Sequence, residues 1–354
     1  MPAEKVLLTG GTGFIASHVL DVLLDHGYTV VVTARSEEKG KRIISALPAD
    51  HRPRVSYVVV ADIAQPGAFD RAVVSSPPFD FVIHTASPYQ LHFADPIADC
   101  LDPAIKGTTG ILQSIHAFAP SVQRVVITSS SAAILDPPNH PPVYNESVWS
   151  SVTLDQATDP AHTYRASKKF AEQAAWNFLK TATPPVNFTL ATINNTYTFG
   201  PLPRSLASLS AGTINTSNLR ILDLVRGRWT DGIPPTAPVF TFVDVRDVAA
   251  AHVRAMEVPE AGGKRFYVVG GYFSNKKIAE IVRRRFGGEL GGVLPSEEVV
   301  GGAEDDFPEG HWGFDNSRSR GVLGVEYRGL EESVVDTVRS ILGVDGGHGE
   351  EGRV

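Results

Sequence analysis

The sequence predicts an α/β protein, with a doubly wound parallel sheet of the Rossmann type and a smaller C-terminal lobe. Short apolar runs at Val6–Thr9, Tyr28–Thr33 and Phe81–His84 alternate with segments of helical periodicity. The runs are continuously apolar, as expected of strands that helices cover on both faces. A glycine-rich turn, Gly10–Gly13, follows the first run directly and precedes the first helix.

The later part of the chain departs from regular alternation. Further strands are expected at 55–60, 125–128 and 188–193, and a polar helix at 37–47. After Ile193 we expect helices at 219–228, 246–258, 275–286 and 330–342, a strand at 239–243, and a strand at 266–269 that returns to the main sheet. The predicted division is a dinucleotide-binding domain of residues 1–193 and 244–270, a substrate-binding lobe of 194–243 and 271–342, and a disordered tail of 343–354.

Composition narrows the class of protein. The chain has 354 residues and a net charge of −7, with Lys and Arg dispersed, so nucleic acid is not an expected partner. Cys100 is the only cysteine, which excludes an internal disulfide and a cysteine-based metal cluster and suits a reducing compartment. With no apolar leader and no apolar run of about 18 residues, we expect a cytoplasmic protein without a membrane partner, as a monomer or homodimer.

The glycine turn is a candidate dinucleotide site. Glycines between a strand and a helix let the backbone approach a pyrophosphate, and the helix N-terminus offers it free N–H groups. The alternative is an ordinary tight turn. The cofactor-binding residues expected here are Gly10, Thr12, Gly13, Phe14 and Ile15.

The end of the second strand indicates which dinucleotide binds. A carboxylate there would suit the ribose hydroxyls of NAD, whereas an arginine suits the 2′-phosphate of NADP. This chain has Arg35 at the strand end and Lys39 one turn later, so NADP(H) is the expected cofactor. Two solvated basic side chains at a helix start are the alternative.

Other cofactor contacts are expected after neighbouring strands, because ligands of parallel sheets bind at the carboxyl ends of the strands. Asp62 can also be read as a helix cap, and the Thr85 segment as a simple turn before Pro88. The residues assigned to the cofactor at these ends are Asp62, Ile63, Thr85, Ala86, Ser87, Thr128 and Asn194.

A serine cluster and a Tyr-x-x-x-Lys pair carry the candidate chemistry. Tyr164 and Lys168 lie one helical turn apart, and an ammonium beside a phenol favours the phenolate and makes the tyrosine a better acid. Ser129–Ser131 ends the fifth strand, where a hydroxyl can donate to a substrate carbonyl oxygen. A helix cap is the alternative role of one of these serines. No metal is needed for this chemistry.

Together these segments resemble the extended short-chain dehydrogenase/reductases. Within them the chain is most similar to the group with dihydroflavonol reductase, cinnamoyl-CoA reductase and the yeast-type NADPH-dependent methylglyoxal and ketone reductases. The shared motifs are TGGTGFIA at 9–16, HTASP at 84–88, PAIKGT at 103–108, TSS at 128–130, YRASKKFAE at 164–172, FGP at 199–201, FVDVRDV at 242–248 and DNSR at 315–318.

The resemblance implies a role for each residue of the site. Tyr164 becomes the proton donor, Lys168 its pKa modulator and a ribose ligand, and Ser130 the hydroxyl that orients the carbonyl group. Hydride passes from the nicotinamide to the carbonyl carbon. Two departures from the family pattern are Gly110, where the family usually has Asn, and Asn195, where it usually has Pro.

The expected function is therefore an NADPH-dependent carbonyl reductase. Aromatic and aliphatic residues in the variable segments favour a hydrophobic ketone or aldehyde as substrate. Alternatives are a sugar-nucleotide epimerase or dehydratase, a hydroxysteroid dehydrogenase, and a non-catalytic nucleotide-sensing regulator. The substrate contacts expected are Tyr89, Phe93, Ser131 and Tyr197.

Overall fold

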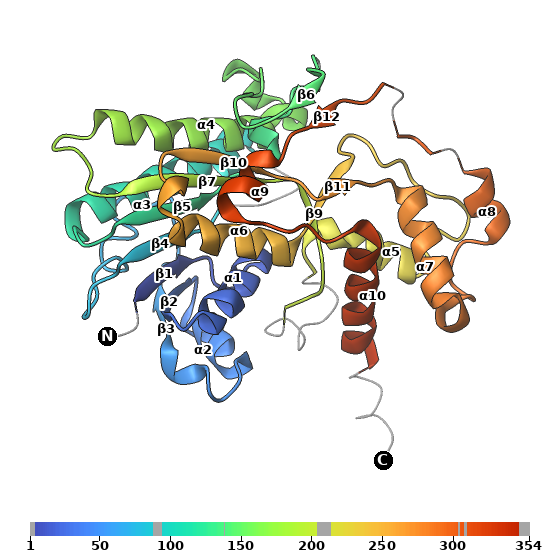
Figure 1. Ribbon diagram of the computed structural model, residues 1–354, viewed down its shortest axis with the longest axis horizontal. Helices are drawn as coiled ribbons and strands as arrows, with labels where there is room; N and C mark the ends of the chain where they lie inside the picture. The colour runs from blue at the N-terminus through green and yellow to red at the C-terminus, as the bar shows by residue number, and fades with distance from the viewer. Residues whose placement is uncertain are drawn as a thin grey trace. The chain divides into compact units, whose positions relative to one another are not determined.

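The protein folds into two compact units. A computed structural model describes residues 4–87, 94–137, 139–203, 214–303, 305–307 and 310–346 (Figure 1). The first unit comprises Met1–Asn195, Ala249–Val268 and Gly313–Val325, and the second comprises Thr196–Val248, Val269–Trp312 and Glu326–Val354.

The first unit is built on a parallel seven-stranded sheet, which confirms the predicted fold class. Its strand order is β10-β7-β5-β4-β1-β2-β3, and every neighbouring pair is parallel. The predicted return of a late strand to this sheet is also confirmed, because β10 pairs with β7. The strands are β1 (Lys5–Thr9), β2 (Thr29–Ala34), β3 (Val55–Val59), β4 (Phe81–His84), β5 (Arg124–Thr128), β7 (Thr189–Asn195) and β10 (Lys264–Val268).

Helices cover both faces of this sheet, which explains why its central strands β1, β4 and β5 are almost completely buried. In Figure 1, α3 and α4 lie on one face and α1, α2 and α6 on the other. A short strand pair, β6 (Val143–Tyr144) with β12 (Gly313–Phe314), was not predicted. The helices are α1 (Phe14–Asp25), α2 (Glu37–Ala46), α3 (Asp102–Phe118), α4 (Pro160–Thr181), α6 (Val245–Glu257, in this unit from Ala249) and α9 (Ser317–Leu323). Cys100 is buried in a π-helical segment, Ile97–Leu101, before α3.

The second unit surrounds a small three-stranded sheet of order β11-β9-β8. The sequence predicted only its central strand. Helix α5 ends at Val225, three residues before its predicted end, and α10 continues to Gly346, past the predicted boundary at 342. The elements are β8 (Tyr197–Phe199), β9 (Thr241–Asp244), β11 (Gly271–Tyr272), α5 (Leu219–Val225), α7 (Asn275–Leu290), α8 (Glu297–Gly302) and α10 (Leu330–Gly346).

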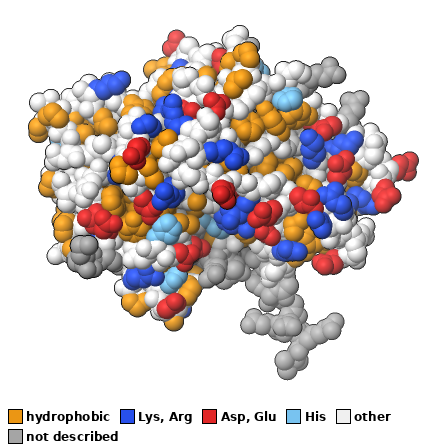
Figure 2. All heavy atoms as spheres, in the orientation of Figure 1, with side chains coloured by type: hydrophobic (Ala, Val, Ile, Leu, Met, Phe, Trp, Pro, Cys, Tyr) orange, Lys and Arg blue, Asp and Glu red, His pale blue; other side chains and the backbone are white. Residues whose placement is uncertain are grey.

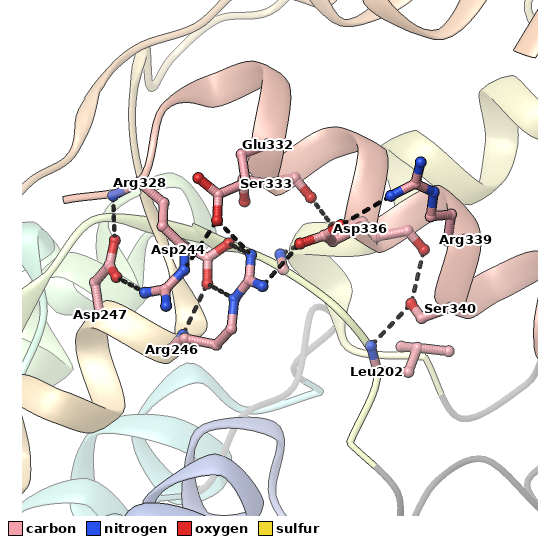
Figure 3. A network of polar contacts seen from close by, with 12 residues as sticks. Leu202, Asp244, Arg246, Asp247, Arg328, Glu332, Ser333, Asp336, Arg339 and Ser340 are labelled. Carbon is pink, nitrogen blue, oxygen red and sulfur yellow. Dashed lines mark hydrogen bonds and ion pairs between the residues drawn. The ribbon is translucent and has the colours of Figure 1, made fainter. Parts of the chain in front are cut away.

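An ion-pair network joins the end of β9 to α10 within the second unit (Figure 3). Arg246 donates through Nε and Nη2, each at 2.9 Å, to the two oxygens of Asp244, which is fully buried. Its Nη1 donates to Asp336 at 2.8 Å. Asp247 accepts from the backbone N–H and the guanidinium of Arg328, although burial raises the pKa of Asp247 to about 6. Arg246 is thus the group that compensates the buried charge of Asp244.

Replacing Arg246 by Leu is expected to lower the free energy of unfolding by about 3–5 kcal/mol, because the Asp244 carboxylate would stay buried without its partner. Arg339→Leu is the matched control. The Arg339 side chain is 70% exposed and contacts Asp336 at 3.6 Å, so its removal is expected to cost less than about 1 kcal/mol. Urea denaturation measures the free energy of unfolding of both variants. Equal decreases in the two variants would contradict the role given to Arg246.

Charges of both signs are intermixed on the face drawn in Figure 2, with no basic patch there. Within the described part of the chain, no helix has both the length and the apolar character that a membrane span requires. Nor do three or more His, Cys, Asp or Glu side chains gather there in a way that could hold a metal ion.

Candidate active site

The glycine turn has a backbone that only glycine adopts easily. Gly10 has φ +72°, and a Cβ added to it would meet the backbone of Ala86 at 3.0 Å. Gly13 is the exposed N-cap of α1, where no side chain caps the helix and no acidic residue lies in the first turn. The free N–H groups in the first turn of α1 thus have no capping side chain, and Thr12, Phe14 and Ile15 are partly exposed around that turn. This arrangement fits the pyrophosphate of a dinucleotide.

The basic residues predicted for the 2′-phosphate lie at the end of β2 and the start of α2. Arg35 and Lys39 are both exposed, and the Ser36 hydroxyl caps α2 by accepting from Lys39 N–H at 3.3 Å. Asp62 accepts from Ala64 N–H at 2.9 Å and also from Gln65. These hydrogen bonds, and more weakly the charge of Arg35, lower the pKa of Asp62. The structure thus brings Arg35 near Asp62, and the alternative of a helix cap is wrong, because turns rather than a helix follow Asp62.

The segment after β4 is held by the end of β1. Thr85 Oγ1 donates to Thr9 O at 2.6 Å, and Ala86 N–H donates to Thr9 Oγ1 at 3.1 Å. Ser87 Oγ accepts from Lys168 Nζ at 2.9 Å. The segment predicted to contact the cofactor and the candidate catalytic lysine are therefore in direct contact.

A buried histidine lies beneath these strand ends and was not predicted to have a role. His84 is 2% exposed, and its Nδ1 lies 2.9 Å from Thr9 Oγ1. Burial, with a smaller effect from the charge of Lys168, lowers the pKa of His84 to about 3. His84 is thus neutral at physiological pH and adds no charge beside Lys168.

Tyr164 and Lys168 lie on successive turns of α4, as their spacing predicts. The helix begins at Pro160 because Asp159 accepts from Ala161 N–H at 3.0 Å and caps it. Lys168 Nζ lies 5.8 Å from the centre of the Tyr164 ring. Burial lowers the pKa of Lys168 to about 8. The lysine is therefore mostly charged near pH 7. Its ammonium lies close enough to the Tyr164 ring to stabilise a phenolate.

The serine cluster turns the chain at the end of β5. Ser130 Oγ accepts from Ala132 N–H at 3.1 Å and caps a short 3₁₀-helix, Ser131–Ala133, which packs against α4. The capping alternative thus holds for Ser130 itself. A hydroxyl that accepts in this way keeps its own hydrogen for donation to a carbonyl oxygen.

Several other predicted residues are engaged within the protein. Thr128 Oγ1 lies 2.7 Å from His252 Nε2 on α6. Asn194 is fully buried, and its amide donates to the Ser130 carbonyl at 3.3 Å. Ser131 is 6% exposed. A Cβ added to Gly107 of α3 would lie 2.9 Å from the Ile63 side chain. The absence of a Cβ at Gly107 therefore lets Ile63 pack closely against α3.

Of the residues predicted to contact substrate, Tyr89 and Phe93 lie outside the described residues. Tyr197 belongs to β8 in the second unit. Its ring lies 5.6 Å from that of Phe273, and the Arg220 guanidinium lies 4.5 Å from its centre. Tyr197 is therefore part of a mixed aromatic and cationic cluster.

The two departures from the family pattern have different settings. A Cβ added to Gly110, in α3, would meet no atom within 4 Å. The space that an asparagine side chain would enter at this position is therefore open. Asn195 ends β7 opposite Val268 of β10 and is 9% exposed. A proline at position 195 would remove the backbone N–H donor from this strand end.

Comparison with known proteins gives the same assignment over nearly the whole chain. Residues 6–270 match the model of the NAD dependent epimerase/dehydratase family. The chain is 54% identical over 340 residues to ketoreductase azaE of Aspergillus niger, covering 96% of this chain and 98% of that protein. It is 35% identical over 348 residues to NADPH-dependent methylglyoxal reductase GRE2 of Saccharomyces cerevisiae, covering 97% and 99%.

A solved structure agrees with these relatives. The crystal structure of yeast methylglyoxal/isovaleraldehyde reductase Gre2 complexed with NADPH superposes with a TM-score of 0.87 at 35% identity, covering 97% of this chain and 99% of that one. The predicted resemblance is thereby confirmed. The chain belongs to the NAD dependent epimerase/dehydratase family, among the extended short-chain dehydrogenase/reductases.

Proposed function

We propose that this protein is an NADPH-dependent reductase that converts a hydrophobic aldehyde or ketone to an alcohol, with Tyr164 as the proton donor. The ketoreductase and methylglyoxal reductase relatives support an enzyme that reduces carbonyl groups with NADPH. The observation that carries the proposal is the position of Lys168, with its ammonium 2.9 Å from Ser87 Oγ and 5.8 Å from the Tyr164 ring centre.

The residues of the site divide the reaction between them. The bound NADPH supplies the hydride that forms the new C–H bond at the carbonyl carbon. Ser130 donates a hydrogen bond to the carbonyl oxygen and favours the charge that develops there. Tyr164 transfers its phenolic proton to that oxygen and completes the alcohol. Lys168 stabilises the phenolate that remains, until a proton from solvent restores the tyrosine.

The α1 N-terminus would hold the pyrophosphate of NADP, and Arg35 and Lys39 would hold its 2′-phosphate. Arg35→Ala is expected to raise the KM for NADPH by about 10-fold or more, because one charge-assisted contact is worth at least ~1.4 kcal/mol. The KM for NADH should change little. Lys41→Ala, which removes another exposed cation of α2, is the control. Initial rates with each cofactor give the result, and equal effects on both cofactors would count against a phosphate contact.

The preference for a hydrophobic substrate is supported by the aromatic side chains of the second unit. Tyr197 lies with its ring 5.4 Å from that of Phe199 and 5.6 Å from that of Phe273. Phe199 and Phe273 are fully buried, so the partly exposed Tyr197 ring is the member of this group that offers apolar surface, beside the Arg220 guanidinium. We therefore expect aryl ketones, diketones and branched aldehydes to be better substrates than charged ones.

The experiment that tests this function is a substrate panel with purified protein. Consumption of NADPH is followed with aryl ketones, diketones, 2-oxoaldehydes and dihydroflavonols, and the alcohols are identified by chromatography. We expect turnover of at least one class with NADPH and much slower turnover with NADH. Absence of turnover across the panel, together with tightly bound NAD in the purified protein, would indicate an epimerase or dehydratase instead.

A further inference from the structure

Glu172 is a buried carboxylate at the centre of a hydrogen-bond network in the first unit. It lies on α4 and is 2% exposed. Its Oε2 accepts from Ser129 Oγ at 2.6 Å and from Asn194 Nδ2 at 2.7 Å. Its Oε1 accepts from Thr192 Oγ1 at 2.9 Å and from Trp176 Nε1 at 3.3 Å. Both oxygens are thus well supplied with donors, as a buried charge requires.

Arg265, on β10, balances the charge of Glu172 and holds it in place. Its Nε donates to Glu172 Oε1 at 2.7 Å, and its Nη2 to Oε2 at 3.3 Å. Nη1 donates to the carbonyl groups of Glu146 and Val148, at 2.7 and 2.9 Å. The guanidinium also lies 3.6 Å from the centre of the Trp149 ring. A planar, multiply bonded arginine of this kind fixes its carboxylate partner in one orientation.

The network ends on the turn that carries Ser130. Besides its bond to Glu172, Asn194 donates through Nδ2 to Ser129 Oγ at 3.1 Å and to Ser130 O at 3.3 Å. The neighbouring Ser129 N–H donates to Ile193 O at 2.8 Å. The side chain of Ser129 and the carbonyl of Ser130 are thus tied to the network, which leaves the Ser130 hydroxyl to donate to substrate.

The same helix carries Glu172 and the candidate catalytic pair. Tyr164, Lys168 and Glu172 recur at intervals of four residues on α4, and so lie along one face. A bond from Glu172 to Ser129 therefore connects the serine turn directly to the helix that holds Tyr164. Two groups that act on one carbonyl oxygen need such a connection, because small errors in their separation are costly to the rate.

We propose that Glu172, held by Arg265, is a positioning residue that fixes Ser130 relative to α4 through Ser129 and Asn194. The inference rests on the proposed reductase function, in which Ser130 orients the carbonyl group. It adds a role for a buried carboxylate that contacts neither substrate nor cofactor in the mechanism above. The network holds Ser130 in position and takes no part in the transfer of the proton or the hydride.

Ser129→Ala tests the proposal by cutting one bond of the network while keeping the Glu172–Arg265 ion pair. We expect kcat to fall by about 10-fold or more, with the KM for NADPH unchanged, because the change misplaces Ser130 without touching the cofactor site. Trp176→Phe is the matched control, because it removes an N–H that donates to the other oxygen of the same carboxylate from α4. Its kcat should stay within about 2-fold of that of the wild type.

A double-mutant cycle separates positioning from general structural damage. If Ser129 acts through Ser130, Ser129→Ala should lower single-turnover rates by less than about 2-fold in a Ser130→Ala background. A loss in that background as large as in the wild type would overturn the proposal. Full activity of Ser129→Ala would also overturn it. If Ser130→Ala alone left kcat unchanged, the catalytic role of Ser130 would be refuted, and with it the need for positioning.

Glu172→Gln extends the test to the carboxylate itself. It leaves the Arg265 guanidinium without its charged partner, so its folding is monitored by thermal unfolding alongside kcat. If the variant folds, the expected result is a loss of kcat at least as large as that of Ser129→Ala. A folded variant with wild-type kcat would contradict the role given to Glu172. If it does not fold, Ser129→Ala and its cycle decide the question alone.

Discussion

Tyr164→Phe is expected to lower kcat for carbonyl reduction by about 10²–10⁴-fold, the range typical of a lost general acid. The change removes one oxygen atom and leaves the ring beside Lys168. NADPH affinity should therefore stay within a few-fold of the wild-type value, which titration of the reduced cofactor's fluorescence can measure. A large loss of kcat with intact cofactor binding would assign the proton transfer to this hydroxyl.

The matched control for this variant is Tyr28→Phe. Tyr28 precedes β2, and its hydroxyl donates to Glu257 at 3.3 Å within the first unit. The same atom is lost, but at the start of a strand rather than near the carboxyl ends where ligands bind. We expect Tyr28→Phe to keep wild-type kcat. If Tyr164→Phe behaved like Tyr28→Phe, the proposed mechanism would be wrong.

Lys168→Met is expected to reduce activity strongly and, in the cofactor-free protein, to increase stability near pH 7. Burial lowers the pKa of Lys168 from 10.5 to about 8, so the folded state disfavours the charged lysine. Methionine fills a similar volume without a charge, and the gain in the free energy of unfolding should be ~1–3 kcal/mol, allowing for the lost bond to Ser87. The loss of kcat should be on the order of 10²-fold or more, because the phenolate loses its cation.

The stability effect has a defined dependence on pH. Below about pH 8 the lysine is charged in both the folded and the unfolded states, and its full cost is present. Between pH 8 and 10.5 the folded state has released a proton that the unfolded chain still holds, so the cost disappears as the pH rises. Urea denaturation should therefore show the advantage of Lys168→Met at about pH 7 and little of it near pH 10. A difference that is constant with pH would exclude titration of Lys168 as its cause.

The sequence predicted the first unit well because its signals are long and repeated. Buried parallel strands such as β2 are rich in valine and carry no charged residue, and the glycine turn gives the first helix a clear start. The second unit was harder to predict. Strands β8 and β11 have three and two residues, which is too short for a periodic pattern, and their pairing with β9 depends on contacts between distant segments.

The candidate site was also predictable from the sequence only in part. Tyr164 and Lys168 are separated by one turn, so their proximity follows from helix geometry alone. The partner of Glu172 could not be predicted in this way, because Arg265 lies 93 residues away and meets it only through the pairing of β10 with β7. A glutamate and an arginine at such a distance in sequence look like any two surface residues. Their burial reveals that they form a unit.

The central claim is that this protein delivers hydride from NADPH to a carbonyl carbon. The most direct measurement uses NADPH deuterated at its reacting carbon, a substrate from the panel, and mass spectrometry of the product. We expect one deuterium on the carbinol carbon of the alcohol made by the wild-type protein, and little product from Tyr164→Phe. Product without deuterium, or deuterium that returns to the cofactor while the substrate is rearranged, would contradict the claim.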